Sequence, residues 1–265
     1  TIMLAKLLEE VNESAKNDQL IDAIINEKGL KITPLTNNVP ENARNFIQKV
    51  YSMLPKIKIT NLLQEVDSWV HFSDSFTHLK TSKVAENNQL LLSVILSDAI
   101  NLGLSKMAEA TTDATYSKLS SIQGWHIRHE TYKNAQAILT NAIHEQSITK
   151  YWGDGSSSSS DGQRFKTGGI NQLSASINPK YGTDPGMIYY SHTSDKYAPF
   201  SMQLITSNVR DSTYVLDGLL NHEADLDIIE HYTDTAGFTD HVFAMMNFQG
   251  FKFTPRIKDL KDKKI

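Results

Sequence analysis

The chain has 265 residues, of which 40% are hydrophobic and 21% charged, and its formal net charge is −4 at pH 7. This mixture excludes fibrous and disordered proteins, and the length allows one large domain or two ordinary ones. Cysteine is absent, which excludes disulfides, thiolate zinc sites and thiol nucleophiles, and the small negative charge indicates that any contact with DNA is local.

The N-terminal segment has neither the basic region nor the cleavage site of a signal peptide. Apolar residues recur at helical spacing from Leu4 to Ile25 and predict helical structure that Gly29 ends. Further helices are expected over residues 43–54, from an N-cap at Thr60 to Val70, over 87–110 and over 130–148. Residues 1–150 are therefore interpreted as a helical platform.

The most apolar run, residues 90–104, contains several polar residues and is shorter than the about 20 residues of a membrane-spanning helix. It is interpreted as part of a buried helix in a protein without membrane contact. Together with the absence of a signal peptide and of cysteine, this predicts a cytoplasmic protein.

The pattern changes at residues 151–155, after which β-forming residues dominate. Strands are predicted over residues 157–166, 186–193, 200–205, 228–233 and 251–257, with helices over 212–221 and 236–248. The order β-β-β-α-β-α-β matches the ribonuclease-H-like fold, in which three antiparallel strands are extended by parallel strands reached through helices. The expected fold class is α+β or α/β, with a helical N-terminal half followed by a partial ribonuclease-H-like domain over residues 151–265.

Five serines, residues 156–160, precede the first of these strands. Such a composition is typical of a flexible linker. The run is short, however, and continues into the alternating polar and apolar residues Gln163 to Lys166, which suit a strand. We therefore interpret the serines as part of the strand.

Two aspartates lie on strands that the predicted fold makes neighbours. Asp161 belongs to the first strand and Asp234 follows the fourth, and in a ribonuclease-H-like sheet these two strands are adjacent. Carboxylate oxygens suit Mg²⁺, and two such ions can promote phosphodiester chemistry, although most of these sites need a third carboxylate. Asp154 is an alternative to Asp161, and Asp240 to Asp234; both are expected instead to form local hydrogen bonds or caps.

Other polar and aromatic residues allow more than one interpretation. His192, on the second predicted strand, fits either a structural role at a sheet edge or a place near the metal site. Trp69, Trp125 and Trp152 have apolar neighbours and are interpreted as anchors of the core or of a domain boundary.

Six segments form an ordered set of motifs, at residues 99–104, 125–132, 152–165, 189–200, 215–220 and 231–240. From about residue 57 to the C-terminus, the chain resembles the Tn-three family of replicative transposases. The resemblance implies a DDE transposase, which uses an Asp-Asp-Glu triad on a ribonuclease-H-like fold with Mg²⁺ or Mn²⁺. It implies that Asp161 and Asp234 are catalytic metal ligands. It also implies DNA, as transposon ends and target, as the partner, and self-association of the full-length protein.

One departure from the family bears on activity. The family's glutamate lies on a helix far beyond the second aspartate, whereas this chain ends at Ile265 and residues 258–265 contain no glutamate. The family's region for recognising transposon ends is also missing. We therefore expect a fragment that binds metal weakly or not at all and is inactive by itself. The alternatives are a non-catalytic remnant or self-association module, and a nuclease that takes its third carboxylate from Glu230 or Asp240.

Overall fold

The fold is described from a computed structural model, which covers residues 2–20, 22–27, 29–33, 40, 42–168, 176–179 and 182–258. The chain divides into two compact units. One contains residues 1–56 and 258–265, and the other contains residues 57–257. Among the described residues, no helix combines the length and the apolar character needed to cross a membrane.

The first unit contains α1 (Ile2–Lys16), an antiparallel hairpin of β1 (Ala23–Asn26) and β2 (Gly29–Ile32), and α2 (Ala43–Met53). The expectation of helical structure up to Gly29 is wrong. Helix α1 ends because Asp18 adopts a left-handed conformation, with φ 52°. The β-branched pair Ile24 and Ile25 then forms a strand, and Gly29, with φ 103°, follows the turn.

The second unit begins with helices that surround two apolar clusters. These helices are α3 (Ile59–Val70), η1 (Phe72–Ser75), α4 (Asn88–Ala99), α5 (Leu104–Ala110), α6 (Tyr116–His126), α7 (His129–Glu145) and η2 (Ser147–Tyr151). The predicted helix over residues 87–110 is two helices, because Asn101 and Gly103 have φ of 51° and 82° and break it. Helix α3 begins one residue before the expected cap Thr60, and α6 was not predicted.

A mixed sheet follows the helices. Its elements are β3 (Ser157–Lys166), β4 (Ser176–Ile177), β5 (Pro185–Ser194), β6 (Pro199–Thr206), η4 (Asp211–Tyr214), α8 (Val215–Leu220), β7 (Glu230–Thr233), α9 (Asp240–Phe248) and β8 (Lys252–Phe253). The strands lie in the order β4-β5-β3-β7-β8, with β6 also paired to β5. Strands β3, β5 and β6 are antiparallel, and β7 and β8 extend the sheet in parallel. The two-residue strand β4 was not expected.

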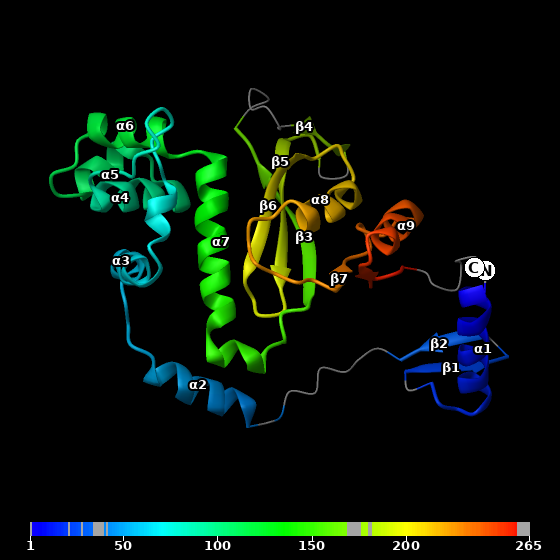
Figure 1. The fold of residues 1–265 in the computed structure, drawn as a ribbon. Coiled ribbons are helices and arrows are strands. Elements are labelled where there is room, and N and C mark those ends of the chain that lie inside the picture. The colour runs from blue at the N-terminus through cyan, green and yellow to red at the C-terminus, as the bar shows by residue number, and fades with distance from the viewer. Residues whose placement is uncertain are drawn as a thin grey trace. The chain divides into compact units, whose positions relative to one another are not determined.

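One face of this sheet is covered and the other is exposed. On the covered face, residues of the helices α7, α8 and α9 (Figure 1) form an apolar core with β5 and β6. Tyr190, Phe200 and Met246 of this core are almost fully buried. The other face carries partly exposed Phe165, Tyr189 and other apolar side chains. The predicted tryptophan anchors Trp69, Trp125 and Trp152 are 66%, 38% and 51% exposed, so none is a core residue.

Candidate metal site

Four of the five serines, residues 157–160, lie in the first half of β3, as predicted, and Ser156 directly precedes the strand. Ser158 and Ser160 are buried, whereas Ser159 and Asp161 are exposed. This alternation arises because successive side chains of a strand point to opposite faces of the sheet. The serines therefore give β3 an inner face of small hydroxyl groups and leave Asp161 on the open face.

The register of β3 and β7 brings the two predicted metal ligands to the same part of the sheet. Ser157, Ser158, Ser159 and Ser160 pair in parallel with Glu230, His231, Tyr232 and Thr233. Asp161 directly follows the last paired residue of β3, and Asp234 directly follows that of β7. Both aspartates are exposed, whereas Ser160 and Thr233 are buried.

Backbone amides fix one oxygen of each carboxylate. The Gly162 N–H donates to Asp161 Oδ1 at 2.8 Å. The N–H groups of Ala236 and Gly237 donate to Asp234 Oδ1 at 2.9 and 3.2 Å, in a turn that begins at the aspartate. No described residue donates a hydrogen bond to Oδ2 of either side chain, so each aspartate keeps one carboxylate oxygen for a ligand.

Gly237 allows the turn after β7 to close. A Cβ atom at this position would lie 2.6 Å from both Cβ and Oγ1 of Thr233, so any other residue would push the turn away from the strand. The glycine thus permits the close approach through which its amide reaches Asp234.

Asp154 has local partners, as expected, whereas the N-cap of α9 is Thr239 and not Asp240. Asp154 accepts hydrogen bonds from the hydroxyl and N–H of Ser156 at 2.6 and 2.9 Å, and these bonds lower its pKa. Asp240 lies in the first turn of α9, where a negative charge is favoured by the helix dipole.

Glu230, a possible third carboxylate, accepts hydrogen bonds from the hydroxyls of Tyr232 and Thr254, and its pKa is lowered. It lies at the opposite end of β7 from Asp234, about 13 Å away at the usual rise of a strand. Within the described ranges, no three His, Cys, Asp or Glu side chains are arranged to hold a metal ion. The glutamate-free tail 259–265 lies outside the described residues.

Behind the open face, a buried polar network joins β3, β5 and β7. His231 is fully buried, with Nδ1 2.8 Å from Ser158 Oγ and Nε2 2.8 Å from Ser160 Oγ. Ser160 Oγ also lies 2.7 Å from the Tyr190 hydroxyl. Burial, together with the nearby imidazole of His192, lowers the pKa of His231 to about 3, so its ring is neutral near pH 7.

His192 connects this network to α8. Its ring stacks on that of His231 with centroids 5.4 Å apart, and its Nε2–H donates to the Val215 carbonyl at 2.9 Å. Burial lowers the pKa of His192 to about 4. A Cβ atom on Gly218 would lie 2.1 Å from the His192 ring, so α8 packs directly against it. His192 is therefore a core residue of β5, an interior strand paired with β3, β4 and β6, and lies on the covered face, away from Asp161.

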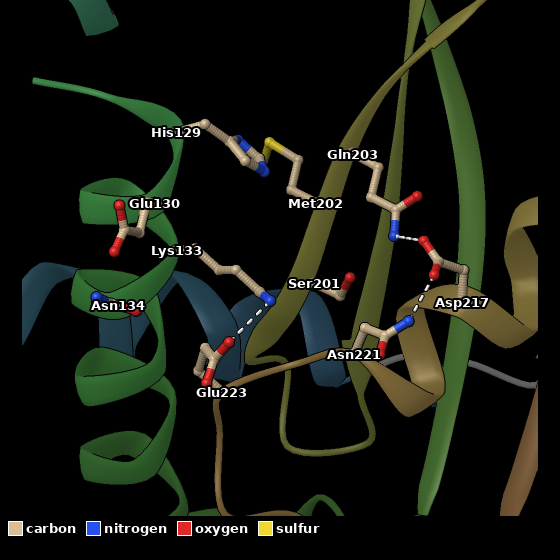
Figure 2. A pocket seen from close by; sticks show the side chains of 10 residues that line it. All are labelled: His129, Glu130, Lys133, Asn134, Ser201, Met202, Gln203, Asp217, Asn221 and Glu223. Atoms are coloured by element: carbon tan, nitrogen blue, oxygen red, sulfur yellow. Dashed lines mark hydrogen bonds and ion pairs between the residues drawn. The ribbon is translucent and has the colours of Figure 1, made fainter.

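A separate groove of about 400 Å³ lies between α7, β6 and α8, and contains neither predicted metal ligand (Figure 2). Lys133, Glu223 and Asp217 have partners within the groove, and Glu130 pairs with Arg128, which does not line it. Lys133 pairs with Glu223 at 2.9 Å, and Asp217 accepts hydrogen bonds from Gln203 and Asn221 (Figure 2). This groove therefore offers no set of free charges for an ionic ligand.

Comparison with known proteins identifies the family. The Tn3 transposase DDE domain matches residues 61–265. The chain is 56% identical to the transposase for transposon Tn501 of Pseudomonas aeruginosa, over 99% of this chain and 27% of the relative. It is 55% identical to the transposase for transposon Tn3926 of Escherichia coli over the same shares, and 43% identical to that for Tn1546 of Enterococcus faecium, over 97% of this chain and 26% of the relative. The chain thus spans about a quarter of the length of these relatives, and it belongs to the Tn3 transposase DDE domain family.

Proposed function

We propose that Asp161 and Asp234 are the first two catalytic carboxylates of a DDE transposase and that they bind Mg²⁺ or Mn²⁺. The register that ends at Ser160 and Thr233 is the observation that carries this proposal. Residues directly across a parallel ladder point to the same face, so the two aspartates that follow the last pair share the open face of the sheet.

The donor atoms at this pair suit a hard divalent cation. Both side chains offer carboxylate oxygen, the ligand type that Mg²⁺ and Mn²⁺ prefer. Hydrogen bonds from backbone amides hold one oxygen of each aspartate and restrict its rotation. When bound, divalent ions would activate the attacking oxygen and stabilise the leaving oxygen of a phosphodiester. The open face around Asp161 gives a DNA backbone access to these carboxylates.

The wider architecture extends the proposal to the whole protein. We assign residues 151–265 to a partial ribonuclease-H-like catalytic domain and residues 1–150 to a helical platform. The antiparallel β3, β5 and β6, extended by the parallel β7 and β8, support the fold. The complete transposase would bind transposon ends and target DNA, nick the ends and transfer the 3′ strand, with self-association of the full-length chain. These steps need a third carboxylate, so the 265-residue chain is expected to be inactive alone.

Paramagnetic NMR on the 265-residue chain tests the metal site. Mn²⁺ should selectively broaden the amide signals near Asp161 and Asp234, and both Asp161→Asn and Asp234→Asn should remove this broadening. Asp240→Asn, which changes a nearby carboxylate in α9, is the control and should leave it unchanged. Broadening that survives both substitutions, or that disappears with Asp240→Asn alone, would overturn the assignment. Absence of broadening in the unaltered chain would overturn the proposal that Asp161 and Asp234 bind the ion in this chain.

A further inference from the structure

We propose that His231 is a positioning residue that sets the register of β7 on β3 and thereby holds Asp234 beside Asp161. The inference rests on the proposed function, because it concerns how the two carboxylates are brought together. It is carried by the two hydrogen bonds between the His231 ring and the serines of β3.

The ladder between β3 and β7 needs such a device because it is short and its β3 side is repetitive. Only four residue pairs are formed, and every residue of β3 among them is serine. Identical small side chains specify register poorly. A slip of two residues would keep His231 on the buried face but would displace Asp234 from Asp161 by about 6.6 Å along the strands. The two carboxylates would then no longer share one site.

The imidazole of His231 distinguishes the observed register from one slipped toward the end of β3. In the observed register, it lies between the hydroxyls of Ser158 and Ser160. A neutral imidazole has one donor and one acceptor nitrogen, so one serine donates and the other accepts. After a slip of two residues, Gly162 would replace one serine, and one buried ring nitrogen would lose its partner.

A slip in the other direction is opposed by Asp154. That register would place His231 between Ser156 and Ser158, which also offer two hydroxyls. The Asp154 carboxylate, however, already holds the Ser156 hydroxyl at 2.6 Å and its N–H at 2.9 Å. Ser160, which His231 would leave, is tied to the Tyr190 hydroxyl of β5. In the observed register His231 therefore meets two hydroxyls that Asp154 does not hold.

The His231 ring also packs against other residues on the covered face of the sheet. His192 stacks on it, and Gly218 of α8 packs against His192 so closely that a methyl group would not fit. The ring therefore has little freedom to tilt out from between the two serines. Helix α8 thus supports the placement of Asp234 through two histidine rings.

Serine substitutions in the 265-residue chain test this role. Ser158→Ala and Ser160→Ala each remove one partner of His231. Each should lower the Mn²⁺ affinity of the folded chain about tenfold, because a buried ring nitrogen without a partner no longer favours the observed register. Ser159→Ala, on the exposed face of the same strand, is the matched control and should not change it. Ser160→Thr restores a hydroxyl and should recover the affinity. Both alanine variants binding Mn²⁺ as tightly as the unaltered chain would overturn the proposal.

The register of β7 on β3 is also measured without metal, from nuclear Overhauser contacts between protons of Ser160 and Thr233. These contacts should be present in the unaltered chain and in Ser159→Ala, and weakened or replaced by contacts two residues away in the alanine variants. If the contacts shift but Mn²⁺ never binds at the aspartates, the proposed function fails and the register role of His231 stands. If Mn²⁺ binds and the contacts stay unchanged in both alanine variants, the role of His231 is refuted while the proposed function stands.

Discussion

The two buried histidines predict that the second unit loses stability when the pH falls below about 6.5. Their pKa values in the folded chain are about 4 for His192 and about 3 for His231, against an ordinary value of 6.5. The unfolded chain therefore binds protons that the folded chain excludes. Their contribution is fully present above pH 6.5 and is lost as the pH falls toward the folded values. In this window the free energy of unfolding falls by about 1.4 kcal/mol per pH unit for each histidine, and by about 2.7 kcal/mol per pH unit for the pair.

From pH 6.5 to pH 5 the pair thus removes about 3 kcal/mol, a large share of the about 5–15 kcal/mol that stabilises a typical domain. His144 and His222, whose pKa values burial also lowers, act in the same direction. Carboxylates with lowered pKa, such as Glu230, lose their contribution only below about pH 4.5. The histidines therefore dominate between pH 6.5 and 4.5.

Urea unfolding at pH 7.5, 6.5, 5.5 and 4.5, followed by circular dichroism, measures this dependence. The unfolding free energy should be level at the two higher pH values and fall steeply below them. His192→Gln should reduce the slope by about 1.4 kcal/mol per pH unit. The control His241→Gln, at an exposed position of α9, should leave it unchanged. A level free energy down to pH 5, or an equal slope in both variants, would refute the assignment of buried neutral rings.

Two glycine substitutions probe the packing around the site. Gly218→Ala would place a methyl group 2.1 Å from the His192 ring and should destabilise the chain by about 1–3 kcal/mol in thermal unfolding, whereas Gly124→Ala, with open space in α6, should be neutral or stabilising. Gly237→Ala should displace the turn that holds Asp234 and weaken Mn²⁺ binding, measured by amide broadening. An unchanged melting temperature in the first case, or unchanged broadening in the second, would contradict the respective contact.

The three antiparallel strands were predicted closely, whereas the predicted strands over residues 228–233 and 251–257 are shorter in the structure, as β7 (Glu230–Thr233) and β8 (Lys252–Phe253). The predicted strand over residues 157–166 has the bounds of β3, and those over 186–193 and 200–205 differ from β5 and β6 by one residue at each end. The hairpin of β1 and β2 was missed because a short apolar run such as Ile24-Ile25 fits a helix face and a strand equally well. Its outcome depended on the left-handed turn at Asp18.

The candidate site also has one part that the sequence predicts and one part that it does not. The placement of Asp161 on β3 and of Asp234 directly after the neighbouring strand β7 follows from strand order, so a sequence pattern can predict it. The role of His231 could not be predicted, because its partners lie 71 and 73 residues away and are fixed only by the register. Before the fold is known, a histidine between Glu230 and Tyr232 fits an exposed strand position as well as a buried one.

Serines on a buried strand face are explained by what apolar residues would do there. Valine or isoleucine at the positions of Ser158 and Ser160 would bury more apolar surface, but one apolar side chain packs acceptably against another in several registers. Hydroxyls that flank a buried imidazole satisfy its two nitrogens in a specific alignment, and misalignment leaves a buried polar atom without a partner. The interface between β3 and β7 therefore gives up some burial and gains a defined register. That gain matters most at this interface, because the two exposed carboxylates follow the last residues it pairs.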